Sequence, residues 1–274
     1  MVDLCILTTM NGIAQSGRTV ILQAESYNMQ TIYRLDKKPP FLHNAKNLRT
    51  NQSRRYDMES PVDKFWRIRL ADIKQSLETN NFGAFIAQNA AEARNIVLNE
   101  IIPAIAPKSI SWGGSMTFVA TGLYDELANN KKIKVIDTFD KTISRDDGWE
   151  RRRQALLVDL FFTGTNAVTE SGMLVNLDML GNRVAAIAFG PKNVIILVGR
   201  NKIVADLEDA MMRIKNYVAP ANVLRLGMKT PCAKTSHCDE CKSSGRLCNS
   251  WAITEKSFPK GRVKVILINE DLGL

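Results

Sequence analysis

The sequence predicts an α/β protein in which a mostly parallel β-sheet lies between two layers of helices. Short runs of Val, Ile, Leu and Phe, such as residues 160–162 and 193–198, lack the alternation of a half-exposed strand. Such runs fit strands that are buried on both faces. They alternate along the chain with longer segments of helical period, and this alternation favours a parallel sheet with right-handed crossovers.

Each expected element has a signal of its own. Ser60 and Pro61 are residue types favoured at a helix N-cap and at the first helical position. Asn89 with Glu92 forms a capping box, and Pro103 is expected to end the helix that follows. The expected helices span residues 62–77, 89–102, 115–129, 149–158, 184–189 and 203–217, and the expected strands span 84–87, 109–112, 132–136, 160–163, 173–175, 193–198 and 263–268.

Residues 1–57 differ from the rest of the chain. They are rich in Asn, Gln, Thr and Arg and show no sustained period. We expect them to form a disordered leader, or to lie upstream of a true start at Met58, with one α/β domain over residues 58–274. The alternative is a small hairpin formed by Leu4–Thr8 and Thr19–Leu22.

The net charge of +9 lies mainly at the two ends of the chain. Residues 1–57 and 225–274 each carry +4, whereas residues 58–224 carry +1. A nucleic-acid-binding domain would be expected to carry its basic residues on its folded face, so nucleic acid is an unexpected partner.

No apolar run approaches the ~20 residues of a membrane helix, and no secretory signal is recognisable. We therefore expect a cytoplasmic protein.

Small polar residues follow the apolar runs of two expected strands. In open α/β sheets ligands bind at the carboxyl ends of the strands. Glycines let a ligand approach the backbone, and a helix N-terminus favours phosphate or carboxylate. The alternative is a tight turn with Ser115 as an N-cap, and polar groups that only satisfy strand ends. The predicted ligand-binding residues are Gly113, Gly114, Ser115, Thr117, Gly164, Thr165, Asn166, Asn182 and Arg183.

The segments SWGGSMT (111–117) and TGTNAVTESGMLVN (163–176), followed by GNRVAAIAFGPKNVI (181–195), resemble the LUD domain, a lactate-utilisation family. The resemblance covers roughly residues 58–270. It implies a fold similar to the sugar-isomerase and coenzyme A transferase group. It also implies a subunit of an L-lactate or related organic-acid oxidation system with iron–sulfur oxidoreductase partners. The ligand would be a small organic acid or a phosphorylated molecule.

Glu170 is the predicted catalytic residue. It lies in a Thr-Glu-Ser-Gly turn between two apolar segments, where partial burial would suit it for proton transfer. Coenzyme A transferases use a glutamate before a glycine as nucleophile, and residues 169–172 are similar although the surrounding residues differ. An acyl-transferase-like or sugar-phosphate isomerase-like enzyme is therefore an alternative function. The other interpretation of Glu170 is a carboxylate that holds its own turn.

Arg183, at the start of an expected helix, is a candidate carboxylate clamp, because a guanidinium can bind both oxygens of a carboxylate. The alternative is an ion pair with Asp178.

Trp112 is expected in the core. Only two histidines are present, His43 and His237, and this scarcity argues against hydrolases with a catalytic histidine.

Four of the five cysteines lie in a polar loop over residues 227–262, with a central Cys-x-x-Cys pair. Clustered thiols in a cytoplasmic chain favour metal ligation over disulfides. The spacing leaves zinc and an iron–sulfur cluster open, and His237 could replace a thiol at a zinc site. Free thiols or a redox dithiol are the alternatives, and a zinc-containing basic binding module is a further candidate function. The predicted metal ligands are Cys232, Cys238, Cys241 and Cys248.

Overall fold

The uninterrupted apolar runs form a six-stranded, fully parallel sheet. The computed structural model describes residues 14–16, 19–23, 30–34 and 59–274. The strand order is β4-β13-β10-β7-β5-β6, and every neighbouring pair is parallel. The predicted α/β class with a mostly parallel sheet is thereby confirmed. The strands are β4 (Gly83–Ala87), β5 (Ser109–Trp112), β6 (Lys134–Ile136), β7 (Leu160–Gly164), β10 (Asn193–Gly199) and β13 (Val263–Ile268).

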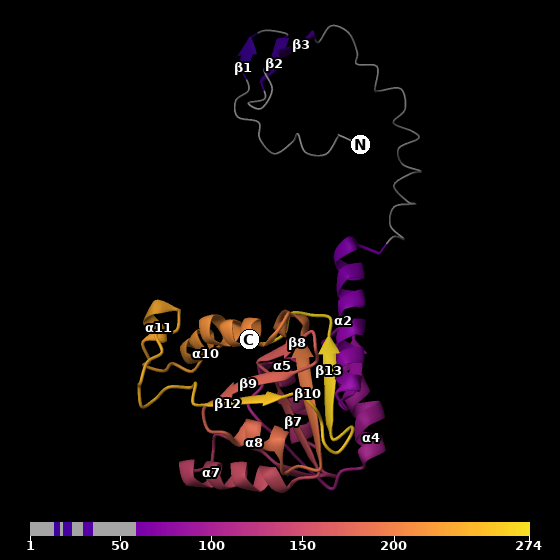
Figure 1. Ribbon diagram of the computed structural model, residues 1–274, viewed down its shortest axis with the longest axis vertical. Coiled ribbons are helices and arrows are strands. Elements are labelled where there is room, and N and C mark those ends of the chain that lie inside the picture. Colours follow the sequence, from indigo (N-terminus) through magenta and orange to yellow (C-terminus); the bar gives the residue numbers. More distant parts are fainter. Residues whose placement is uncertain (1–13, 17–18, 24–29, 35–58) are drawn as a thin grey trace. The chain divides into compact units, whose positions relative to one another are not determined.

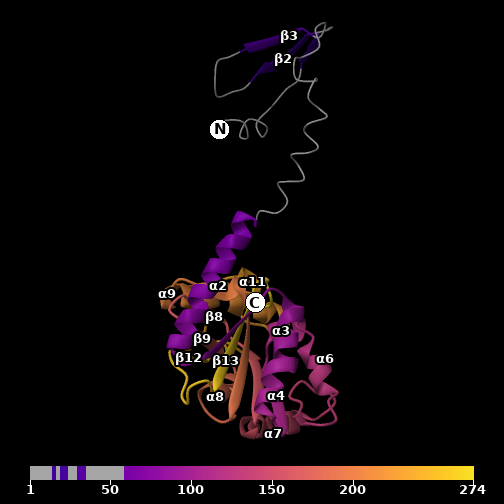
Figure 2. The same cartoon turned by 90° about the vertical axis from the view of Figure 1, so that its right-hand side faces the viewer.

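Helices cover both faces of this sheet, as Figure 2 shows with α3, α4 and α6 on one side and α2 and α8 on the other. Successive strand residues point to opposite faces. Phe161 accordingly belongs to the core under α2 and α8, and Phe162 to the core under α3, α5 and α6. Trp112 is fully buried in the second core, as predicted. The helices are α2 (Pro61–Thr79), α3 (Ala90–Ile96), α4 (Ile102–Ile105), α5 (Met116–Ala120), α6 (Leu123–Ala128), α7 (Arg145–Gln154) and α8 (Asn182–Ala188).

A smaller sheet, in the order β11-β8-β9-β12, carries the polar residues that follow β7. Its strands are β8 (Ala167–Thr169), β9 (Leu174–Asp178), β11 (Ile203–Val204) and β12 (Ser250–Thr254). Strand β8 pairs with β11 in parallel and with β9 antiparallel, and β12 pairs antiparallel with β9. Helices α9 (Leu207–Arg213) and α10 (Ala219–Arg225) are joined by a π-helical turn at Ile214–Val218, and α11 is Cys232–Thr235.

Several predicted boundaries are wrong, and each error has a local cause. The helix expected over 203–217 begins only at Leu207, because residues 203–204 pair with β8 and Asp206 provides the N-cap. Pro103 does not end its helix. It lies in the first turn of α4, after a π-helical turn (Val97–Ile101), where a proline is tolerated.

Two further predictions were too simple. The helix expected over 115–129 is interrupted at Gly122, which has a φ of 74° and separates α5 from α6. The loop expected over 227–262 contains α11 and the strand β12.

The chain divides into two compact units, Met1–Glu59 and Ser60–Leu274. In the first unit, β1 (Ala14–Ser16), β2 (Thr19–Gln23) and β3 (Gln30–Arg34) form an antiparallel sheet. Of the alternative hairpin, Thr19–Leu22 is in β2, and Leu4–Thr8 lies outside the described residues. The interpretation of residues 1–57 as a leader stays a prediction. Within the described part of the chain, no helix has the length and apolar character to cross a membrane.

Candidate functional site

The carboxyl ends of the parallel strands gather most of the predicted ligand-binding residues. In Figure 1 the arrow of β13 points to the end of the sheet where α5 and the C-terminus lie. A Cβ atom on Gly164 would lie 2.6 Å from Ser115 Oγ, and one on Gly113 would lie 3.4 Å from Arg183 Cβ. The end of β7, the start of α5 and the start of α8 are therefore in direct contact. We call this region the strand-end site.

Ser115 is the N-cap of α5, and its hydroxyl accepts a hydrogen bond from Phe118 N at 3.1 Å. The N-cap interpretation of Ser115 is therefore confirmed, and the same hydroxyl faces Gly164. Gly113 is buried beneath Phe161, whereas Gly114 is exposed. Only the inner part of the glycine turn thus contributes to the strand-end site.

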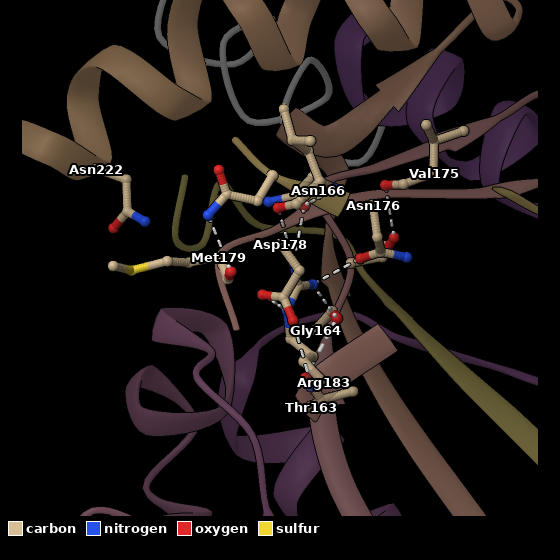
Figure 3. Close-up of polar contacts among 12 residues, drawn as sticks. Thr163, Gly164, Asn166, Val175, Asn176, Asp178, Met179, Arg183 and Asn222 are labelled. Carbon is tan, nitrogen blue, oxygen red and sulfur yellow. Dashed lines mark hydrogen bonds and ion pairs between the residues drawn. The ribbon is translucent and has the colours of Figure 1, made fainter. Parts of the chain in front are cut away.

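Arg183 is buried, with 7% of its surface exposed, and its guanidinium is surrounded by acceptors of the protein itself. Figure 3 shows it reaching from α8 toward Gly164 and Asn176. Its Nη1 donates to Gly164 O at 3.1 Å and to Asn176 Oδ1 at 2.6 Å, and its Nη2 donates to Asn166 Oδ1 at 2.9 Å. Its Nε lies 3.5 Å from Asp178 Oδ1, so the predicted ion pair is present.

This network makes Arg183 a positioning residue for the loop after β7. Burial lowers the pKa of Arg183, and the charge of Asp178 opposes that shift. Asn166 is fixed from both sides, because its Oδ1 also accepts from Leu177 N at 2.9 Å. The side-chain Nδ2 of Asn176 is a buried donor that has no hydrogen-bond partner among the described residues.

Thr165 and Asn182 contribute less to this region. The hydroxyl of Thr165 is buried and donates to the carbonyl oxygens of Ala167 and Val175, both at 3.1 Å. It therefore links β8 to β9. Asn182 is the partly exposed first residue of α8. Among the described residues, neither side chain has a hydrogen bond to the side chain of Ser115 or Arg183.

Lys202 is a site residue that the sequence analysis missed. It follows β10 and is only 4% exposed, and its Nζ donates to Thr117 Oγ1 at 2.8 Å. Burial, together with the positive charges of Arg213 and Arg183, lowers the pKa of Lys202 from 10.5 to about 7. Its position directly after a buried strand was the available signal, because that is where ligand-binding residues collect in such sheets.

The C-terminal segment 269–273 covers Lys202 and Thr117. Thr117 Oγ1 donates to Leu272 O at 3.0 Å, and Asn201 binds the backbone of Leu272 and Gly273, each at 3.1 Å. A Cβ on Gly273 would lie 3.2 Å from Lys202 Nζ. This segment therefore covers the strand-end site at the carboxyl end of β10.

Arg213 supports the strand-end site from α9. Its Nη1 donates to Asn166 O at 2.9 Å, and its Nε donates to Asn201 O at 3.2 Å. Burial lowers the pKa of Arg213. The loops after β7 and β10 are thus held together by one guanidinium.

Within the part of the chain that the structure describes, Glu170 has no hydrogen bond or ion pair with Ser115, Arg183 or Lys202. Its side chain is 48% exposed and lies 2.6 Å from Arg69 Nη2 on α2. The turn that carries it packs on the same helix, because Asn80 Nδ2 donates to Ser171 O at 2.8 Å. The catalytic assignment of Glu170 stays a prediction, and its ion pair supports the alternative in which the carboxylate holds its turn.

The four predicted cysteine ligands line one cavity of about 20 Å³ between α10 and the loop before β12. Hydrogen bonds from Ser243, with Arg246 nearby, lower the pKa of the Cys241 thiol. His237 does not line this cavity; its Nδ1 pairs with Thr235 O at 2.8 Å. In the described part of the chain, no three His, Cys, Asp or Glu side chains are already gathered closely enough to hold a metal.

The parallel sheet with helices on both faces defines an α/β protein of the open-sheet class. The family model of the LUD domain matches residues 70–268. The chain therefore belongs to the LUD domain family, a family of lactate-utilisation-type proteins. The resemblance predicted from residues 111–117, 163–176 and 181–195 is thereby confirmed.

Comparison with individual proteins gives matches among solved structures. No curated protein matches the chain significantly. Among solved structures, the chain is similar to a DUF162 family protein from Deinococcus radiodurans, with 15% sequence identity and a TM-score of 0.42. The similarity covers 74% of this chain and 98% of that one.

Proposed function

We propose that this chain is a ligand-binding subunit of an organic-acid oxidation system of the lactate-utilisation type. It binds a small carboxylate at the strand-end site, and partner subunits with iron–sulfur centres accept the electrons. Family membership supports the choice of system. The observation that carries the choice of ligand is the buried ammonium of Lys202, whose Nζ donates to the neutral hydroxyl of Thr117.

The charges around Lys202 favour an anionic ligand. Arg183 is already paired with Asp178. The charges that act on Lys202 are those of Arg213 and Arg183, and both are positive. Burying an ammonium without a counter-charge is costly, and an opposite charge within about 4–6 Å offsets that cost. A carboxylate beside Lys202 would supply this negative charge.

The uncharged donors indicate a small ligand that carries further oxygen atoms. The amide Nδ2 of Asn176 is a buried donor without a partner among the described residues, and the hydroxyl of Ser115 borders Gly164. A 2-hydroxy or 2-oxo acid offers a carboxylate for Lys202 and a second oxygen for such donors. The closeness of segment 269–273 favours a small acid over a phosphorylated molecule.

Calorimetric titration of the purified chain with L-lactate, pyruvate and inorganic phosphate tests this function. We expect binding of at least one of the two acids, and a loss of at least about tenfold in affinity in Lys202→Met, equivalent to about 1.4 kcal/mol. If phosphate binds more strongly than either acid, the ligand of this site is a phosphorylated molecule and the proposed carboxylate is wrong.

Lys264→Met is the matched control. Lys264 is a partly buried lysine at the start of β13, the opposite end of the sheet, where its Nζ donates to Asn193 Oδ1 at 2.9 Å. Its substitution should leave the affinity unchanged. Equal affinity in wild type and Lys202→Met, with both proteins folded, would contradict the proposed ligand site.

A further inference from the structure

The four cysteines surround a single small space although they are spread over 17 residues of the chain. Cys232 opens α11, and the other three lie between α11 and β12. All four line the same cavity of about 20 Å³. Four cysteines around one space match in number and type the donor set of a tetrahedral thiolate site.

The wall of this cavity is held by ordered structure on both sides. Ala219 and Val223 of α10 form one side. On the other side, Arg246 donates to Cys241 O at 2.6 Å and to Cys248 O at 2.6 Å and 2.9 Å. Asn249 N then donates to Asp178 O at 3.1 Å, directly before β12 pairs with β9. The loop is therefore anchored at both of its ends.

The backbone on both sides of Cys238 is strained. Ser236 has a φ of 61° and Glu240 has a φ of 47°, and neither residue is a glycine. Left-handed conformations cost non-glycine residues roughly 1–2 kcal/mol. Ser236 is also the left-handed C-cap of α11, and Glu240 turns the chain between Cys238 and Cys241. Metal–thiolate bonds would offset the cost of that second turn.

Positive charges border the thiols. Lys215 Nζ lies 3.8 Å from Cys238 Sγ and 2.6 Å from Glu240 Oε1, and Arg246 also lines the cavity. Four thiolates with one divalent cation carry a net charge of −2. The guanidinium of Arg246 is suited to offset part of that charge. Lys215 is shared with Glu240, and Asp239 also lines the cavity.

Four cysteines suit either a single tetrahedral ion or an iron–sulfur cluster. One buried water needs roughly 10–15 Å³, so the cavity of about 20 Å³ has room for a single ion. Among mononuclear ions, zinc suits tetrahedral sites of four thiolates and imposes no geometry of its own.

We infer that Cys232, Cys238, Cys241 and Cys248 bind one zinc ion, which fixes the loop between α10 and β12. The thiols line the cavity without being drawn together, so binding moves each sulfur inward to its bond length of about 2.3 Å. Cysteine loops of this kind commonly become ordered when the metal binds.

Metal analysis of the full chain, purified anaerobically, tests the inference. We expect one zinc per chain and no acid-labile sulfide. Replacement of zinc by Co²⁺ should produce thiolate-to-cobalt charge-transfer bands and the visible bands of a tetrahedral ion. Iron with sulfide and absorbance near 410 nm, one iron without sulfide, or a chain without metal would each overturn the inference.

Two serine variants distinguish the loss of the metal site from unfolding of the chain. Cys241→Ser should lower zinc content and weaken Co²⁺ binding at least about tenfold, while circular dichroism still shows the α/β body. Cys5→Ser, which changes a cysteine outside the cluster, should keep one zinc per chain. A folded Cys241→Ser protein that binds zinc and Co²⁺ as tightly as wild type contradicts the assignment.

Discussion

At the scale of single residues, the buried cation Lys202 determines the chemistry of the strand-end site. An ammonium that is 96% buried, beside Arg183 and Arg213, is destabilised relative to its neutral form, and its pKa of about 7 expresses that cost. A bound anion favours the protonated form. Protonation of Lys202 and anion binding must therefore depend on each other.

This dependence gives a prediction for stability as a function of pH. Below pH about 7 Lys202 is protonated in both the folded and the unfolded chain, and the full cost of burying its ammonium is present. Between about 7 and 10.5 the unfolded chain binds more protons, so stability rises with pH, by up to about 1.4 kcal/mol per pH unit. Urea unfolding of wild type and Lys202→Met across this range measures the difference.

The control is again Lys264→Met. It should keep the pH dependence due to Lys202 and lose only the part due to Lys264 itself, because burial also lowers the pKa of Lys264. Affinity for a small acid should fall by up to about tenfold per pH unit above 7, because the anion requires the protonated lysine. Identical pH dependence in wild type and Lys202→Met would mean that Lys202 keeps an ordinary pKa in the folded chain.

Residue types at strand ends were predictable, whereas their partners were not. Gly113, Ser115 and Gly164 follow apolar runs and lie in contact, and Arg183, at the start of an expected helix, reaches the same region. The burial of Lys202 depends on the distant segment 269–273, and no local pattern announces that contact. The ion pair of Glu170 with α2 likewise joins residues about a hundred positions apart.

At the scale of elements, the end of β7 packs closely against the start of α5. A methyl group on Gly164 would lie 2.6 Å from Ser115 Oγ and 3.4 Å from Leu197 O. Glycine is therefore required by close packing here.

A double-mutant cycle measures this packing. Gly164→Ala should destabilise the chain by about 1–3 kcal/mol through overpacking, and Ser115→Ala by about 1 kcal/mol through loss of the N-cap. The double variant lacks Ser115 Oγ, the atom that the new methyl group would clash with. Its loss in free energy of unfolding, measured with urea, should therefore be smaller than the sum of the two single losses by at least about 0.5 kcal/mol. Simple additivity would show that the two elements do not touch as described.

Gly245→Ala is the control for this cycle, because a Cβ at that position meets nothing within 4 Å. Its effect should be within about 0.5 kcal/mol, as for an ordinary surface change.

Elements with a strong apolar period were found from the sequence, and irregular ones were not. Strand β11 has two residues and forms only because β8 lies beside it. The π-helical turns before Pro103 and Pro220 shift the hydrogen-bond register, which a helical period does not reveal. Strand β12 depends on β9 in the same way.

At the scale of the whole folded unit, the strand-end site and the cysteine loop share their supports. Arg213 holds the loop after β7, and Lys215, two residues later in the chain, contacts Cys238 and Glu240. Strand β9 carries Asp178, which pairs with Arg183, and it also pairs with the strand that follows the cysteines. A metal that orders the loop would therefore stabilise the scaffold of the ligand site.

A crystal structure of the chain soaked with L-lactate or pyruvate tests the central claim most directly. The account predicts a carboxylate within hydrogen-bond distance of Lys202 Nζ, beside Thr117 and beneath segment 269–273. The acid bound at another surface, or no bound acid in crystals where segment 269–273 is free to move, would contradict it.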